Sequence, residues 1–142
     1  MASLPQADLV TELLRKAKTI AVVGLSSKPA RASYGVARFL QRQGYRIIPI
    51  NPAETEVLGE RAYARIAEVP DAIDIVDVFR RSEAVLEVLE DALPKKPRCF
   101  WMQEGVVNEE AARRAEAAGI SVVMDHCILK EIARLRPSRY DR

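Results

Sequence analysis

The stretch from Thr19 to Asn51 constrains the fold more than any other part of this chain. A continuous apolar run, Thr19–Val23, leads into Gly24 and a loop rich in serine, lysine and arginine. A helical pattern then leads to a second apolar run, Tyr45–Ile50. Unbroken apolar runs are typical of parallel strands that are covered on both faces. The order strand, loop, helix, strand therefore predicts half of a nucleotide-binding βαβ unit.

Strands and helices continue to alternate through the rest of the chain. Three further apolar runs predict strands over Ile73–Val78, Cys99–Met102 and Ile120–Met124. This pattern predicts an α/β fold, a single Rossmann-like, doubly wound domain over residues 1–142, with a five-stranded parallel sheet and helices on both faces. Counted along the chain, we expect the strand order 3-2-1-4-5, which puts the switch point, and therefore the ligand, between the first and fourth strands. We expect residues 136–142 to form a flexible tail.

Composition and charge narrow the range of functions. A net charge of +2 over 142 residues is too small to indicate a nucleic-acid-binding protein. Two cysteines, Cys99 and Cys127, and one histidine, His126, do not form the cluster that a zinc site needs. The longest apolar runs are far shorter than the roughly 20 residues of a membrane span, and the N-terminal residues lack the pattern of a signal peptide. We therefore expect a cytoplasmic protein that binds neither nucleic acid nor membrane.

The loop after the first predicted strand has the chemistry of a phosphate site. A glycine at its start allows a sharp turn and lets a ligand approach the backbone. Hydroxyl groups and two cations follow, and the next helix presents free backbone N–H groups at its start. The residues that we expect to hold phosphate are Gly24, Ser26, Ser27, Lys28, Arg31 and Ser33. The alternative is a solvated loop in which Ser33 merely caps the helix.

Two familiar nucleotide motifs do not fit this loop. The dinucleotide pattern G-x-G-x-x-G fails, because Ser26 and Pro29 stand where the second and third glycines belong. The Gly-Lys-Ser/Thr triplet of a P-loop does not occur. The second strand ends in Asn51 and Pro52, not in the acidic residue that usually binds the ribose of NAD. This argues against NAD, whereas the two cations of the loop leave NADP open.

Five segments, taken together, resemble the CoA-binding domain family, small proteins related to the first domain of the succinyl-CoA synthetase α subunit. They read VGLSSKPARASY at 23–34, GYRIIPINP at 44–52, DIVDVFR at 74–80, WMQEG at 101–105 and VMDHC at 123–127. The first two segments are the most specific, and the later ones agree with them in order and spacing. The resemblance covers about Leu13 to Leu135, which is nearly the whole chain.

The resemblance implies coenzyme A, or an acyl-CoA, as the ligand. Of the loop residues named above, those that would hold the CoA phosphates are Gly24, Ser26, Ser27, Arg31 and Ser33. Asn51 and Pro52 would line the adenosine part of the ligand. The pantetheine arm and the adenine would then be contacted by residues at the ends of the third and fourth strands. Phe79 and Arg80 would close over the adenine or the phosphates, and Gln103, Glu104 and Gly105 would lie along the pantetheine arm.

Cys127 follows the fifth predicted strand on the ligand side of the sheet. If it begins a helix, its thiolate is stabilised there and could meet the thiol end of CoA, so we include it among the ligand-binding residues. The alternative is a small buried apolar side chain. His126, where the family more often has arginine, stands beside Asp125 without the further residue that a catalytic triad needs.

The resemblance does not carry over the synthetase reaction, which uses a phosphorylated histidine in a second domain and a partner subunit. We therefore expect a protein that binds CoA and has no catalytic activity of its own. Two alternatives stay open. One is an NADP-dependent oxidoreductase, and the other is a nucleotide-sensing regulatory protein that acts on a protein partner.

Overall fold

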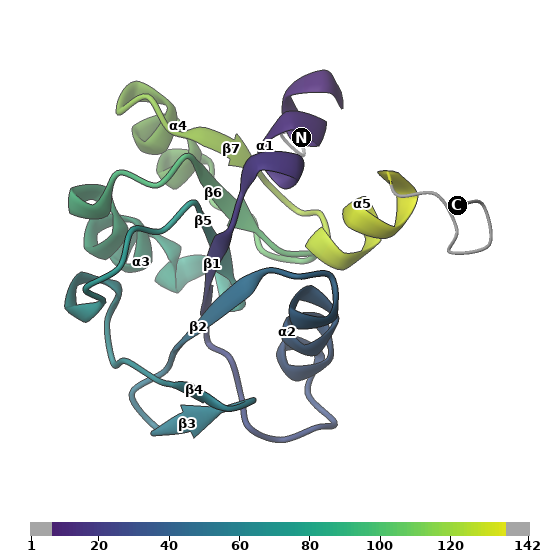
Figure 1. The fold of residues 1–142 in the computed structure, drawn as a ribbon. Helices are drawn as coiled ribbons and strands as arrows, with labels where there is room; N and C mark the ends of the chain where they lie inside the picture. Colours follow the sequence, from purple (N-terminus) through teal and green to yellow (C-terminus); the bar gives the residue numbers. More distant parts are fainter. Residues whose placement is uncertain (1–6, 136–142) are drawn as a thin grey trace.

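A parallel sheet of five strands forms the centre of the molecule, and the computed structural model describes residues 7–135. The strands are β1 (Thr19–Val23), β2 (Arg46–Ile50), β5 (Ile75–Val78), β6 (Cys99–Met102) and β7 (Ser121–Val123). They lie in the order β2-β1-β5-β6-β7, and all four neighbouring pairs are parallel (Figure 1). The tail expected at 136–142 lies outside the described residues.

Helices cover both faces of the sheet, as predicted. One face carries α1 (Ala7–Lys16), α2 (Ala32–Arg42) and α5 (Ile128–Leu135) (Figure 1). The other face carries α3 (Val85–Ala92) and α4 (Glu109–Ala117). Successive side chains of a strand point to opposite faces, so the unbroken apolar strands supply both layers of the core. The α/β class and the doubly wound parallel sheet are confirmed.

The position of one strand differs from the sequence prediction. Counted along the chain, the order is 2-1-3-4-5, because β5 pairs with β1 and not with the far edge of β2. That far edge is occupied by the segment after β2, in which Tyr63 donates its N–H to Pro49 at 2.9 Å and accepts the Asn51 N–H at 2.8 Å. All four residues of β5 are buried, which suits a central strand. The switch point therefore falls between β1 and β5.

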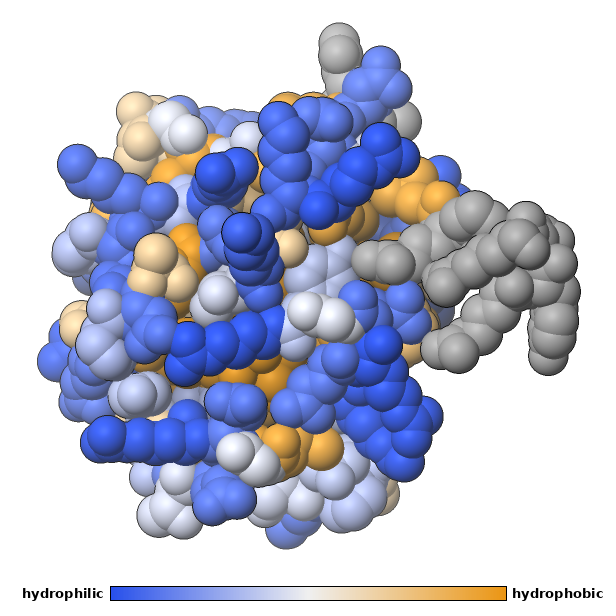
Figure 2. Space-filling model, viewed as in Figure 1, coloured by the Kyte–Doolittle hydropathy of each residue, from blue (hydrophilic) through white to orange (hydrophobic). Residues whose placement is uncertain are grey.

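Short elements connect these layers. A two-stranded hairpin of β3 (Glu56–Val57) and β4 (Glu60–Arg61) precedes the segment that covers β2. Three 3-10 helices follow, η1 (Ile66–Glu68), η2 (Ser82–Ala84) and η3 (Leu93–Lys95). Hydrophilic residues cover most of the face seen in Figure 2, where apolar residues show only in separate areas. Within residues 7–135, the helices are too short and too polar to cross a lipid bilayer.

Asp77 is a polar exception in this core. It lies in β5 between Val22 of β1 and Trp101 of β6, and its exposed fraction is 0%. Neither carboxyl oxygen has a hydrogen-bond partner among the described residues. Burial raises the pKa of the Asp77 carboxyl well above its usual range, because the charged form loses its hydration. Burial therefore favours the neutral acid at this position.

Candidate functional site

Gly24 brings three strand ends together at the carboxyl edge of the sheet. Its φ of 87° lies in the region that favours glycine. A Cβ atom at this position would lie 2.2 Å from the carbonyl oxygen of Phe79, so no other residue fits without a backbone shift. The Gly24 N–H donates to the carbonyl of Ile50 at 2.8 Å. The loop after β1 is thus packed against the ends of both β2 and β5.

Two of the predicted phosphate-binding serines hold the loop in shape. The Ser33 hydroxyl, which is buried, accepts the Ser26 N–H at 3.1 Å. The Ser26 hydroxyl accepts the Lys28 N–H at 3.1 Å. Each hydroxyl keeps its own proton as a donor. The sequence pattern predicted direct phosphate contacts, and the structure adds that these side chains first define the loop.

The loop ends at the N-terminus of α2, which is open to a ligand. Arg31 is the N-cap residue, and its side chain makes no capping hydrogen bond. Ser33, which the sequence offered as an alternative cap, is the second residue of the helix. Lys28 and Arg31 are both exposed. An uncapped helix start with two nearby cations is well suited to bind an anion.

Asn51 explains why the second strand ends in an amide and not in an acid. Its Nδ2 donates to the carbonyl of Leu25 at 3.0 Å, and its Oδ1 accepts the Ala53 N–H at 2.9 Å. A carboxylate could not supply the donor of the first bond. Asn51 therefore joins the loop after β1 to the turn after β2, and leaves the neighbouring Pro52 exposed at the edge of a cavity.

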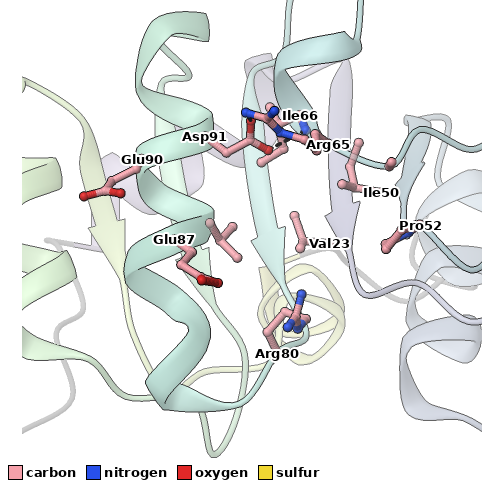
Figure 3. Close-up of a pocket in the computed structure, with 11 residues that line it drawn as sticks. Val23, Ile50, Pro52, Arg65, Ile66, Arg80, Glu87, Glu90 and Asp91 are labelled. Carbon is pink, nitrogen blue, oxygen red and sulfur yellow. Dashed lines mark hydrogen bonds and ion pairs between the residues drawn. The ribbon is translucent and has the colours of Figure 1, made fainter.

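The cavity has a volume of about 410 Å³ and lies between the carboxyl ends of β1 and β2 and helix α3. In Figure 3, Pro52 and Ile50 lie on one side, the acidic residues of α3 lie on the other, and Arg80 lies at the end of β5 between them. Its lining residues are Val23, Ile50, Pro52, Ala64, Arg65, Ile66, Arg80, Glu87, Val88, Glu90 and Asp91. The apolar strand ends form its floor, and charged groups form its rim.

Sequence reasoning found Pro52 and Arg80 but missed the wall that η1 and α3 provide. Asp91 of α3 accepts the N–H groups of Ile66 at 2.6 Å and Ala67 at 3.2 Å, and lies 3.4 Å from the Arg65 guanidinium. These partners are about 25 residues apart in the chain. A contact of that separation leaves no local sequence pattern. In the sequence, this wall is indicated only by the acidic residues beside the apolar stripe of α3.

The predicted pair Phe79 and Arg80 is divided between the two faces of the sheet. Arg80 lines the cavity, and its Cδ lies 3.4 Å from where a Cβ of Gly24 would be. The half-buried side chain of Phe79 packs against the core layer of α1, α2 and α5 instead. The structure therefore brings Arg80 to the candidate site and places the Phe79 ring on the opposite face.

The predicted pantetheine-arm residues connect the ends of β6 and β7. Gln103 is buried, and its Oε1 accepts the Ile128 N–H at 3.0 Å, at the start of α5. Glu104 is exposed and pairs with Lys130 at 2.9 Å. The Gly105 N–H donates to the carboxylate of Asp125 at 2.7 Å. These residues lie on the same edge of the sheet as the loop after β1, beyond the end of β5.

Cys127 immediately precedes α5 and is half-buried against the core layer that contains α5. Its neighbour His126 accepts a hydrogen bond from the Trp101 Nε1 at its backbone carbonyl, at 2.9 Å. Trp101 itself is completely buried. Cys99 is buried as well, and burial raises the pKa of its thiol, so it is held as a neutral thiol.

Comparison with protein families agrees with this architecture. The family model described as CoA binding domain matches residues 18–133. The protein therefore belongs to the CoA-binding domain family, as the five sequence segments predicted.

Relatives of similar length match this chain over nearly its whole length. The uncharacterized protein YneT of Bacillus subtilis is 45% identical over 124 residues, which are 87% of this chain and 92% of that protein. A solved structure from Thermus thermophilus has a TM-score of 0.90 at 36% identity, covering 93% of this chain and 100% of that one. A protein from Pyrococcus horikoshii OT3 has a TM-score of 0.89 at 35% identity, covering 92% of both chains.

A longer relative contains a similar domain as one part of its chain. The acetate–CoA ligase (ADP-forming) I subunit alpha of Pyrococcus furiosus is 33% identical over 86 residues. These residues are 56% of this chain and 19% of the ligase subunit.

Proposed function

We propose that this protein binds coenzyme A, or an acyl-CoA, along the carboxyl edge of its sheet, and that it does so without chemistry of its own. The observation that carries the proposal is the glycine loop and uncapped start of α2, which follow the end of β1 at the same edge of the sheet as a cavity of about 410 Å³. Membership of the CoA-binding domain family supports the same ligand.

The groups of this site suit the parts of the ligand. The start of α2 offers its positive end to the phosphates, and the loop after β1 offers them serine hydroxyls and the cations Lys28 and Arg31. The cavity offers apolar strand ends to a flat purine, and the guanidinium of Arg80 stands at its rim, where it can stack on a base or pair with a phosphate. The cavity is too small for the whole of CoA, so the pantetheine arm must leave it.

The carboxyl edge of the sheet supplies a path for that arm. From the cavity, the edge continues past β5 to the residues Gln103 to Gly105 and then to Cys127. The side-chain oxygen of Gln103 is already used at the start of α5. We therefore assign the contact with the arm to the exposed side chain of Glu104 and the exposed backbone of Gly105.

The same geometry favours CoA over NADP. An NADP site of this fold normally uses a second and a third glycine in the first loop. Here Ser26 stands at the position of the second glycine, and its hydroxyl accepts the Lys28 N–H within the loop. We expect calorimetry to show binding of CoA, with clearly weaker binding of NAD and NADP. Tight binding of NADP with no measurable binding of CoA would contradict the proposal.

Small molecules carried by the purified protein provide a second measurement. We expect mass spectrometry of the denatured protein to detect released CoA or an acyl-CoA. The mass would also identify an acyl group. Recovery of NADP instead would favour the oxidoreductase alternative.

A further inference from the structure

A carboxylate from the turn after β2 binds the loop that we propose for phosphate. The Glu54 carboxylate accepts the backbone N–H of Ser27 at 2.9 Å. Backbone N–H groups of such loops are the usual donors to phosphate oxygens. A carboxylate presents the same kind of anionic acceptor as a phosphate. Glu54 therefore occupies a donor that an anionic ligand of this loop would use.

The neighbouring N–H groups of the loop have neutral partners. Those of Ser26 and Lys28 donate to serine hydroxyls, and that of Arg31 donates to the carbonyl of Lys28. These contacts lie within the loop and the start of α2. Among the hydrogen bonds described for this loop, the one from Ser27 ends on a charged side chain of another segment.

The contact of Glu54 is not needed to join the two segments. Two bonds closer to the sheet already do this, from the Gly24 N–H to Ile50 at 2.8 Å and from Asn51 Nδ2 to Leu25 at 3.0 Å. Both use neutral groups. Ser27 is exposed and Glu54 is only half-buried, so water or a ligand oxygen can replace this contact at little cost.

A turn sets the backbone position of Glu54. The Glu54 N–H donates to the carbonyl of Asn51 at 3.1 Å, and the amide oxygen of Asn51 accepts the Ala53 N–H. Asn51 thus orders both the loop after β1 and the turn that carries Glu54. The turn thereby places the Glu54 carboxylate within hydrogen-bond distance of the loop.

We propose that Glu54 is a displaceable latch on the phosphate loop, which lowers the affinity of the site for anionic ligands and leaves Ser27 when a phosphate binds. This inference rests on the proposed function, because it assigns the regulation of the same site. It identifies Glu54 as a residue that sets affinity. The latch competes with the ligand for one donor, and its charge repels the ligand's phosphates.

Binding by matched variants tests the latch. Glu54→Gln removes the charge and keeps an acceptor, and Glu54→Ala removes both. Glu56→Gln is the control, since Glu56 is exposed on β3 and the change of net charge is the same. We expect Glu54→Gln to bind CoA about three- to tenfold more tightly than the wild type. Glu54→Ala should bind at least as tightly, and Glu56→Gln should stay within about twofold of the wild type.

The opposite results overturn the latch. If Glu54 merely positions the loop, Glu54→Ala will bind CoA more weakly than the wild type. An affinity of Glu54→Gln that matches Glu56→Gln also overturns the proposal. Thermal unfolding of each variant confirms that the fold is intact.

Two measurements without CoA separate this inference from the proposed function. Hydrogen exchange followed by NMR should show a faster exchange of the Ser27 amide in Glu54→Ala than in the wild type, and an equal rate would refute the latch. Inorganic pyrophosphate should bind Glu54→Gln more tightly than it binds the wild type, and equal binding would also refute it. If neither wild type nor variants bind CoA, the proposed ligand fails while these two results still decide the latch.

Discussion

Arg31 occupies a position where its backbone and its side chain have separate tasks. Its carbonyl accepts the N–H groups of Tyr34 and Gly35 as α2 begins, whereas its side chain makes no capping bond. A change of the side chain therefore leaves the start of the helix intact. This separation makes Arg31 a suitable residue for a test of phosphate binding.

We predict that Arg31→Ala weakens CoA binding by roughly 1.5–3 kcal/mol, the usual contribution of a charge-assisted hydrogen bond. Arg31→Lys should recover only part of this loss, because an ammonium group cannot make the paired contacts of a guanidinium. Calorimetry measures both, with Arg38→Ala as the control, since Arg38 is an exposed cation of the same helix. An affinity of Arg31→Ala equal to that of Arg38→Ala would place the Arg31 side chain in solvent.

Asp77 leads to a prediction about stability, because burial favours the neutral form of its carboxyl. The pKa of the carboxyl is raised in the folded state, so the folded protein keeps a proton that the unfolded chain releases above about pH 4. The stability from this proton is present below that pH and is lost as the pH rises toward the folded pKa. The loss amounts to about 1.4 kcal/mol for each pH unit within this window.

We predict that Asp77→Asn removes this slope. Urea unfolding at a series of pH values should show the stability of Asp77→Asn gaining on the wild type as the pH rises from about 4. At the acid end the variant gains nothing, because both side chains are then neutral. Glu116→Gln, an exposed change in α4, is the control and should follow the wild type. Parallel curves for Asp77→Asn and the wild type would show that Asp77 ionises in the folded protein.

At the scale of elements, the sequence predicts local features better than long-range contacts. The run Thr19–Val23 and the residues around Gly24 identify a strand and a tight loop because apolar pattern and glycine chemistry act over a few residues. The place of β5 was not predictable in this way, since it depends on the segment around Tyr63 that occupies the edge of β2. The choice between two edges is made by tertiary packing.

In the candidate site, too, some residues could be predicted from local sequence and others depend on long-range contacts. The phosphate loop and Pro52 follow from strand ends and local motifs. Arg65 and Asp91 could not be found, because their role depends on η1 and α3 meeting across about 25 residues of chain. The neighbouring residues Phe79 and Arg80 lie on opposite faces, as expected for successive residues of an extended chain, but the sequence does not indicate which of the two meets the cavity. Sequence spacing fixes the position of a residue on a strand end, and packing fixes which cavity it lines.

The start of α5 supplies an element-scale prediction about Cys127. We propose that its thiolate attacks CoA disulfide, forming a protein–CoA disulfide and releasing one CoA thiolate. The half-exposed thiol lies directly before the helix, on the edge assigned to the pantetheine arm. Cys99 is buried, so one adduct is expected.

Intact-mass spectrometry after incubation with CoA disulfide measures this step. The wild type should gain the mass of one CoA, and a reductant should remove it. Cys127→Ser should gain none. An adduct that persists in Cys127→Ser, or that never forms in the wild type, would leave Cys127 as a packing residue only.

At the scale of the whole molecule, the carboxyl edge of one sheet carries all the groups that we assign to the ligand. The phosphate loop and the cavity lie at the β2, β1 and β5 end of this edge, and His126 and Cys127 lie after β7 at the other. An extended ligand such as CoA can contact both regions, whereas a compact one cannot. The same separation keeps the histidine away from the serines of the loop.

That separation leads to a prediction about catalysis. Acyl transfer by this chain would need a nucleophile within hydrogen-bond reach of a base. The hydroxyls of Ser26 and Ser33 hold the loop together, and β5 and β6 lie between that loop and the strand that His126 follows. In the acetate–CoA ligase subunit of Pyrococcus furiosus, the segment that matches this chain is 19% of the length, so most of that subunit has no counterpart in the match.

We expect no release of free thiol when the purified protein is incubated with acetyl-CoA, and no acetyl-CoA formation from acetate, CoA and ATP. A thiol reagent and a chromatographic assay measure the two reactions, with His126→Ala as the matched variant. Turnover by the wild type that His126→Ala abolishes would show that the protein is an enzyme and that this histidine takes part.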